Sequence, residues 1–205
     1  TVAQICALAV GLMAILLLSI TRGDLVEGWR SAAPPDAPNR FLINIQPDQR
    51  EAVTQRLAQA GLGHVQLYPM IRGRLIEING RGVGPADYQD DRAQRLVDRE
   101  FNLSYMDQLP GHNRDVAGRW LDPDAAEVSM EQGIAKTLGV NLGDTLRFDI
   151  AGNTVDVKVT GLRAVDWDSM QVNFFAILSP AALRDMPQSW ITALHLPPEK
   201  AELSN

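Results

Sequence analysis

The sequence TLRFDIAGNTVDVKVTGL, residues 145–162, largely decides the fold of this chain. Apolar and polar residues alternate on both sides of the tetrapeptide AGNT, and this alternation is typical of half-buried strands. The Gly152-Asn153 pair at the centre suits a turn with positive φ. The segment therefore predicts a β-hairpin with strands at 146–150 and 155–162, within a sheet-rich domain.

The sequence on either side of the hairpin predicts further short elements. Strands are expected at 127–130, 172–178 and 190–196, and short helices at 131–138 and 181–185. The helix in EQGIAKTLGVNLGD, residues 131–144, places Ile134, Ala135 and Leu138 on one side, and Gly139 is suited to end it.

Residues 40–80 carry a strand–helix–strand pattern. The residues FLINIQ, 41–46, predict a strand, and a helix is expected at 49–60, with Asp48 as N-cap and Gly61 after its end. Further strands are expected at 65–70, 73–79 and 96–103, and loops at 81–95 and 107–119. Together these elements predict an α+β fold, with one βαβ layer and a mostly β insertion.

The N-terminal segment has a different character. Residues 1–21 contain no Asp, Glu, Lys or Arg, and Ile5–Ile20 is apolar except for Ser19. Twenty-one helical residues span about 31 Å, close to the roughly 30 Å hydrocarbon core of a bilayer. We therefore predict a transmembrane helix and stalk over residues 1–31, followed by a Pro-rich connector at 32–39.

Two alternatives to a membrane span were weighed. A signal peptide is disfavoured because no basic residue precedes the apolar run. A buried helix of a soluble protein would rarely be apolar on every face. The flank after the run, with Arg22, Asp24, Glu27 and Arg30, shows no strong basic excess and so favours a non-cytoplasmic side. Because the chain begins with Thr1, we expect a fragment of a longer protein with further membrane helices.

Composition excludes several functional classes. The 205 residues include 19 Lys and Arg against 25 Asp and Glu, which gives a net charge of −6. This acidic balance argues against a nucleic-acid partner, which would require a basic surface. The single cysteine, Cys6, excludes an intrachain disulfide and a Cys-based zinc site.

No motif predicts catalysis, a cofactor or a metal site. The chain lacks the hydrolase and nucleotide-binding signatures, and its three histidines, His64, His112 and His195, share no metal-binding spacing. Acidic pairs occur at 90–91, 122/124 and 166/168, and a solvated turn is the default interpretation of each. The alternative is a membrane-anchored extracytoplasmic enzyme that uses Asp166 and Asp168 as catalytic carboxylates.

The segment VDWDSMQVNFF, residues 165–175, offers a candidate contact surface. Trp167 lies between two aspartates, and Phe174 and Phe175 follow at neighbouring positions that point to opposite faces of a strand. Exposed aromatic side chains often mark interfaces, so Trp167, Phe174 and Phe175 are the candidate contacts with a partner or substrate. The alternative is a core position for the phenylalanines and a loop position for the tryptophan.

These features together resemble the extracytoplasmic domain of FtsX-like, MacB-type ABC transporter permeases, a group that includes MacB and LolC/LolE. The similarity is closest to the YbbP-like permeases and covers nearly the whole chain. Four segments carry it: DAPNRFLINIQPDQ (36–49), YPMIRGRLIEIN (68–79), RLVDREFNLS (95–104) and residues 165–175. The resemblance implies a porter-like part at about 40–80 and 165–205, with a sabre-like insertion at about 81–164.

The resemblance also implies a function. The chain would be a non-catalytic periplasmic domain on the inner membrane that couples ATP hydrolysis to the extraction or hand-over of a lipid-like substrate. The implied partners are a cytoplasmic ABC ATPase subunit, membrane lipid and a periplasmic lysophospholipase or thioesterase. A single-pass interaction domain without an ATPase is the remaining alternative to this transporter role and to the enzyme.

Overall fold

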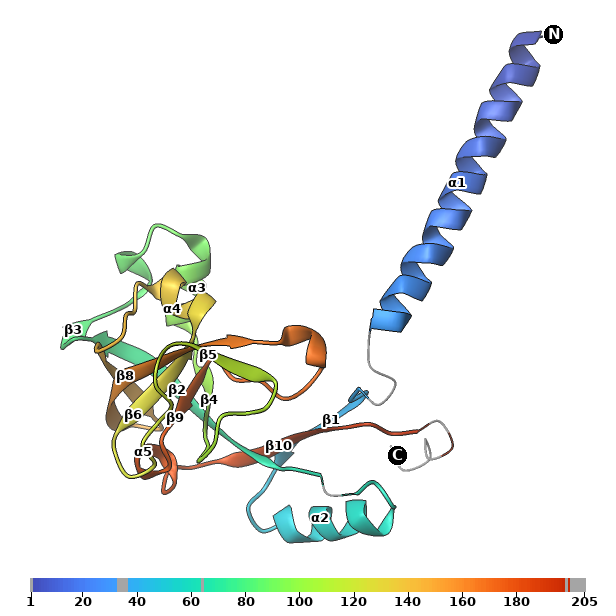
Figure 1. Ribbon diagram of the computed structural model, residues 1–205. Coiled ribbons are helices and arrows are strands. Elements are labelled where there is room, and N and C mark those ends of the chain that lie inside the picture. Colours follow the sequence, from blue (N-terminus) through green and yellow to red (C-terminus); the bar gives the residue numbers. More distant parts are fainter. Residues whose placement is uncertain (1, 33–36, 64, 198, 200–205) are drawn as a thin grey trace. The chain divides into compact units, whose positions relative to one another are not determined.

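The computed structural model describes residues 2–32, 37–63, 65–197 and 199. The chain divides into two compact units, one ending at Ala37 and the other beginning at Pro38. Figure 1 shows the first as one long helix and the second as a sheet-rich domain. Residues 33–36 of the predicted connector, His64 and residues 200–205 of the predicted periplasmic domain lie outside the described residues.

The first unit consists of helix α1, Val2–Ala32. Its stretch Gln4–Arg22 has a mean hydropathy of 2.3 and is exposed throughout. It is the one helix of the described residues long and apolar enough to cross a membrane. The helix continues without a break to Ala32, so the segment predicted as a stalk is also helical.

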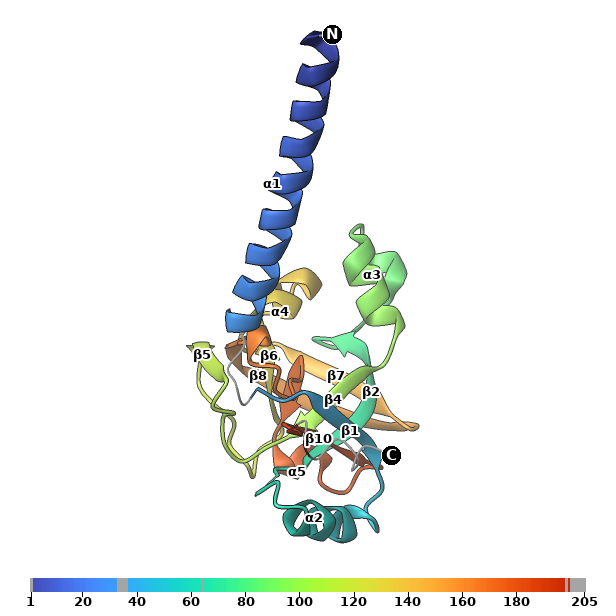
Figure 2. The same ribbon diagram turned by 90° about the vertical axis from the view of Figure 1, so that its right-hand side faces the viewer.

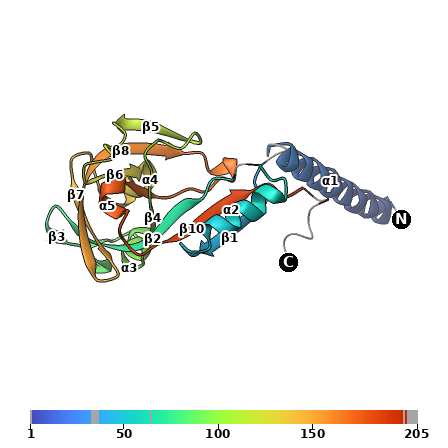
Figure 3. The same cartoon turned by 90° about the horizontal axis from the view of Figure 1, so that it is seen from below.

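The second unit contains a small layer built around strand β10, Ser189–Leu194. This strand lies between β1, Arg40–Ile45, and the start of β2, Tyr68–Ile78, and runs antiparallel to both. Helix α2, Arg50–Gln59, makes the crossover from β1 to β2 and lies over one face of the layer (Figures 1 and 3). The predicted βαβ unit is therefore confirmed, with β10 inserted between its two parallel strands.

Details of this layer correct the sequence-based expectation. The predicted strands at 65–70 and 73–79 are one strand, because Gly73 pairs with Phe101 and continues the ladder. A Cβ atom at Gly73 would meet the Leu103 side chain at 2.6 Å, so the close approach requires glycine. The N-cap of α2 is Gln49 and not Asp48, whereas Gly61 has the positive φ of +68° expected after the helix.

The remaining strands close into a barrel. The second part of β2 pairs with β4, Phe101–Tyr105, and with β7, Thr145–Ile150. The ring is completed by β9, Ala176–Leu178, β6, Glu127–Glu131, and β8, Asn153–Val165, through the pairs β4–β9, β9–β6, β6–β8 and β8–β7. Closure leaves these strands few unpaired edges, and Figure 2 shows them arranged around a common interior.

The barrel interior is the main hydrophobic core. It contains fully buried side chains of five strands, namely Leu75, Leu103, Met130, Leu146, Phe148 and Leu178. Helices α3, Asp91–Asp98, and α4, Gln132–Leu138, add their buried faces to the same cluster. A second cluster, Leu121, Val172, Phe174 and Ile177, lies on the opposite side of β9, because side chains alternate along a strand.

The hairpin that the sequence predicts is confirmed. Strands β7 and β8 pair up to Ile150 and Asn153, so the turn residues are Ala151 and Gly152. Both have positive φ, +51° and +87°, and the Asp149 carboxylate accepts a hydrogen bond from Gly152 N at 2.9 Å. The positive-φ pair is therefore shifted by one residue from the expected Gly-Asn pair.

Several other elements match their predictions. The strand at 127–130 and the helix with Ile134, Ala135 and Leu138 inward are confirmed, and Gly139 ends that helix with φ of +72°. The short helix α5, Pro180–Leu183, and β10 also match their predictions.

Three predictions were wrong in extent. The first residues of the predicted strand at 96–103 belong to helix α3. The helix forms because Ala93, Leu96 and Val97 are buried at helical spacing, and Asp90 is its N-cap. The predicted loop at 107–119 contains strand β5, Asn113–Gly118, which extends the sheet beside β8. Of the residues predicted as a strand at 172–178, only Ala176–Leu178 form one, which is β9.

Three short elements complete the fold. Strand β3, Arg81–Gly82, pairs with the end of β2, and single-turn helices lie at Pro85–Asp87 and Trp167–Ser169. The barrel contains β2, which comes before the expected boundary at residue 80, and β9, which comes after the one at residue 165. Its strands therefore come from both of the expected parts. The division into porter-like and sabre-like parts stays a prediction.

Candidate functional site

The predicted contact residues lie on the loop between β8 and β9, which we call the aromatic loop, residues 166–175. Local turn chemistry shapes its first half. The Asp166 side chain accepts a hydrogen bond from Asp168 N at 3.1 Å, and its carbonyl accepts one from Ser169 Oγ at 2.7 Å. Met170 then takes a left-handed conformation with φ of +55°. These bonds project Trp167 from the surface.

The three aromatic residues of the loop have different environments. Trp167 is 50% exposed and packs against the half-buried Phe175, with ring centroids 5.5 Å apart. Phe174 is 3% exposed and belongs to the second hydrophobic cluster. The surface available to a partner is therefore formed by Trp167 and Phe175, while Phe174 holds the loop from below. Contact with a partner or substrate stays a prediction.

A small cleft opens beside the two exposed rings. Arg99, Glu100 and Asn102 line it from the chain around the start of β4, and Asn173 lines it from the aromatic loop itself. The cleft combines an aromatic wall with a polar rim, which is the general composition of a recognition surface.

A buried arginine anchors the second half of the aromatic loop. Arg163 of β8 is fully buried, and its guanidinium donates hydrogen bonds to the Phe174 carbonyl and to Asn113 Oδ1. Asn113 in turn donates from Nδ2 to Asn173 Oδ1 at 3.1 Å. The guanidinium thus ties the loop to β8 and β5 at once.

His112 adds a second anchor to the same loop. Its Nε2 lies 3.0 Å from the Val172 carbonyl, and its own carbonyl accepts a hydrogen bond from Asp166 N at 3.0 Å. His112 therefore ties the start of the loop to its second half. The sequence offered no signal for this role, because the residues that meet are far apart in the chain.

The electrostatic setting of Arg163 is unusual. Burial lowers its pKa to about 10, although the carboxylates of Glu131 and Asp115 act in the opposite direction. The side chain therefore stays cationic at neutral pH. Among the described residues it forms no ion pair, and its Nε has no hydrogen-bond partner. A charge held in this way is costly to bury, so its hydrogen bonds to the Phe174 carbonyl of the loop and to Asn113 of β5 are the compensation that the fold provides.

The acidic pairs have structural roles in their turns. Asp166 caps the turn that carries Trp167, Asp90 accepts a hydrogen bond from Ala93 N at the start of α3, and Asp122 accepts one from Asp124 N. Within the described part of the chain, no group of three or more His, Cys, Asp or Glu side chains could hold a metal ion. These bonds match the interpretation of the acidic pairs as turns.

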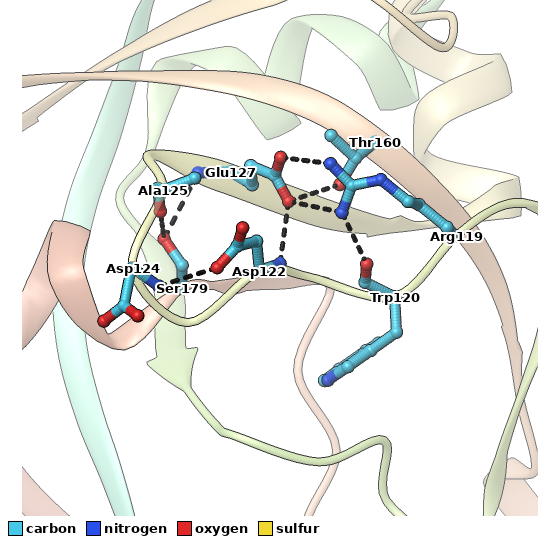
Figure 4. A network of polar contacts seen from close by, with 8 residues as sticks. All are labelled: Arg119, Trp120, Asp122, Asp124, Ala125, Glu127, Thr160 and Ser179. Carbon is cyan, nitrogen blue, oxygen red and sulfur yellow. Dashed lines mark hydrogen bonds and ion pairs between the residues drawn. The ribbon is translucent and has the colours of Figure 1, made fainter.

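Sequence reasoning missed a polar network around Glu127, which Figure 4 shows from close by. Its buried carboxylate accepts hydrogen bonds from Arg119 Nη1 at 2.9 Å, from Asp122 N at 2.8 Å and from Thr160. Burial opposes ionisation of Glu127, but these donors, led by Arg119, hold its pKa below the usual range.

The same network continues to Ser179. This hydroxyl donates to the Ala125 carbonyl and lies 3.2 Å from Glu127 N, which donates to it. The network closes the chain between Arg119 and Glu127 over the second hydrophobic cluster, to which Leu121 belongs. We interpret it as a structural clasp, because the hydrogen bonds drawn in Figure 4 join the Glu127 carboxylate and the Ser179 hydroxyl to the protein's own backbone and side chains.

Comparisons with known proteins identify the class to which this architecture belongs. The chain is homologous to part of an ABC transporter permease, and its apolar N-terminal helix fits a membrane-anchored protein. The relative is named "Uncharacterized ABC transporter permease YbbP" and comes from Escherichia coli (strain K12). It is 42% identical over 195 residues, which cover 94% of this chain. The resemblance to YbbP-like permeases predicted from the sequence is confirmed.

The matched relative is much longer than this chain. The chain spans 23% of the length of YbbP. No family model matches the chain. A crystal structure described as a domain of a candidate permease protein from Porphyromonas gingivalis matches 82% of this chain and 72% of its own, at 11% identity and a TM-score of 0.34. A likeness this weak carries no argument.

Proposed function

We propose that this chain is an extracytoplasmic, non-catalytic part of an ABC permease of the inner membrane. The single observation that carries the proposal is the 42% identity to a permease over nearly the whole chain. In this proposal α1 crosses the membrane and the second unit lies in the periplasm. The mixed charge of the flank after the apolar run agrees with that orientation.

The proposed role is the transmission of movement from the ATPase to the periplasm. An ABC permease works with an ATPase, so a separate cytoplasmic subunit would hydrolyse ATP. Helix α1 is unbroken from Val2 to Ala32, and an unbroken helix is suited to carry a displacement along its axis. The second unit would use this movement to extract or hand over a hydrophobic, lipid-like substrate.

The aromatic loop is the proposed contact surface for the substrate or for a periplasmic partner. Trp167 and Phe175 expose aromatic surface, and Arg163 and His112 hold their loop in place. A soluble lysophospholipase or thioesterase is the partner class that we propose, because such an enzyme would act on the lipid-like product. A loop that is already held in place loses less conformational entropy when a partner binds, which favours binding.

The test is a pull-down of the full-length parent protein from native membranes, followed by mass spectrometry. Recovery of an ABC ATPase, in amounts close to those of the permease, is the expected result. A preparation that retains other membrane complexes but yields no ATPase would overturn the proposal. Repeating the pull-down with Trp167→Ala, and with Met170→Ala on the same loop as a matched control, tests the contact surface separately.

A further inference from the structure

An apolar groove lies between α2 and the strands that it covers. Val53 and Leu57 of α2 and its C-cap Ala60 form a stripe at helical spacing that lines one cavity together with residues of β1 and β10. Figure 3 shows α2 lying over these strands. A helix packed tightly on a sheet buries such a stripe, yet no residue of α2 is buried. A cavity of about 350 Å³ remains between the helix and the strands.

The floor of the groove is apolar and firmly held. Leu194 and Leu196 are buried, and Leu42 of β1 is half-buried beside them. The Asn39 side chain donates to the Leu196 carbonyl at 3.0 Å and accepts from Leu196 N at 2.8 Å. The groove is therefore formed before any ligand arrives, which lowers the cost of binding.

Two arginines stand at the rim of the groove. Arg40 and Arg56 are its only charged lining residues, and both are exposed. Neither takes part in an ion pair with any residue that the structure describes. The neighbouring Arg50 differs, because its guanidinium lies 4.1 Å from the centre of the Trp190 ring. Within the described part of the chain, the groove thus combines an apolar lining with two cations that form no ion pair.

We propose that this groove binds a single-chain amphiphile with an anionic head group. The hydrocarbon chain would lie along Leu42, Leu57 and Leu194, and the acid head would meet Arg40 and Arg56, whose guanidinium groups suit carboxylate or phosphate. Ligand pockets usually measure roughly 300–1,000 Å³, and a cavity of about 350 Å³ lies at the lower end of this range, which favours a ligand with a single chain.

A membrane lipid derivative is the occupant that the surroundings favour. The chain carries its own apolar helix, so a membrane would bring amphiphiles close to the second unit, and the size of the groove selects those with one chain. This inference rests on the membrane anchoring within the proposed function. It does not depend on the ATPase or on a periplasmic enzyme as partner.

Photolabelling tests the inference on the full chain in phosphatidylcholine nanodiscs. The probe is a photoreactive long-chain alkyl phosphate, and the matched probe is the alcohol with the same chain. After irradiation, mass spectrometry locates the adducts. We expect the phosphate to label peptides from residues 40–62 and 194–197 above the rest of the second unit, and the alcohol to label them about tenfold less.

Variants distinguish binding in the groove from attraction of the probe to positive charge elsewhere on the surface. Arg40→Gln with Arg56→Gln should lower groove labelling about tenfold, and Leu57→Trp should also lower it because the larger ring fills the cavity. Arg92→Gln with Arg95→Gln removes the same charge from α3, where both side chains are exposed, and should leave labelling unchanged. Thermal unfolding of each variant verifies that the fold is retained.

Three results would overturn the inference. Equal labelling by phosphate and alcohol, unaffected by the Arg40 and Arg56 changes, would show that no anionic head group is bound. Adducts confined to the aromatic loop would place the lipid at the surface proposed above and not in the groove. Absence of groove labelling with the ATPase still recovered by pull-down removes only this inference, whereas groove labelling without an ATPase removes only the proposed function.

Discussion

At the scale of single residues, substitutions of Trp167 and Phe174 should have different effects on the free energy of unfolding. Trp167 is half-exposed, so Trp167→Ala should change the free energy of unfolding by less than about 1 kcal/mol. Phe174 is buried in the second cluster, so Phe174→Ala should cost about 3–5 kcal/mol. Chemical denaturation of both variants measures this difference. An equally large loss for Trp167→Ala would place that ring in the core.

Arg163 is the residue whose loss should loosen the aromatic loop. Arg163→Met keeps the volume but removes the donors to the Phe174 carbonyl and to Asn113. The unpaired acceptors should cost about 1–3 kcal/mol each, partly offset by the removal of a buried charge. Hydrogen exchange should therefore speed up at residues 166–175. Arg114→Met, at an exposed position, is the control, and identical exchange in both variants would exclude the anchoring role.

The lowered pKa of Glu127 makes the stability of the fold depend on pH. Arg119 and the other donors lower its pKa in the folded state, although burial opposes this effect. The unfolded chain therefore takes up the proton more readily. The stabilisation is complete above the unfolded pKa of about 4.3 and is lost as the pH falls through the lower folded value.

The matched variant for this effect is Glu127→Gln. It should be less stable than the wild type at neutral pH, and the difference should shrink as the solution becomes acidic. Thermal unfolding across this pH range measures both trends. A difference that stays constant down to the most acidic conditions would mean that the carboxylate charge contributes nothing to the clasp.

At the scale of elements, the β7–β8 turn stores measurable strain. Ala151 adopts φ of +51°, a conformation that costs an L-residue with a Cβ atom roughly 1–2 kcal/mol. Ala151→Gly should therefore raise the free energy of unfolding by about 1 kcal/mol. Gly152→Ala, with φ of +87° at the wild-type position, should lower it. The opposite order in a denaturation experiment would contradict the turn geometry.

The elements that could be predicted are those set by neighbours in sequence. The hairpin, α1 and the helix ended by Gly139 follow from local alternation, apolar length and a positive-φ glycine. Helix α3 was missed because LVDREFNL alternates like a strand, while burial of Ala93, Leu96 and Val97 against the barrel selects the helix. Packing, not propensity, decided that segment.

The site could be predicted only in part for a similar reason. The aromatic composition of residues 165–175 indicated the loop and its Trp167. The groups that anchor it, Arg163 and His112, come from β8 and from the start of β5. Their positions depend on the pairing of β5 with β8, whose partners lie more than forty residues apart, and no spacing rule in the sequence encodes this pairing.

At the scale of the whole molecule, the proposed function requires that α1 crosses the membrane and that the second unit lies outside the cytoplasm. The sequence contains one cysteine, Cys6, which lies within the apolar stretch of α1. Asp124 is exposed on the second unit and provides a reporter position. Replacing Cys6→Ala and then Asp124→Cys gives a protein whose single thiol marks the side on which the second unit lies.

The most direct measurement is labelling of this thiol with a membrane-impermeant maleimide in cells whose outer membrane alone has been made permeable. Full labelling of the Asp124→Cys protein is expected. No labelling is expected of the unsubstituted chain, whose one thiol is Cys6, because lipid shields that thiol. Labelling of Asp124→Cys only after the inner membrane is broken would place the second unit in the cytoplasm and contradict the proposed function.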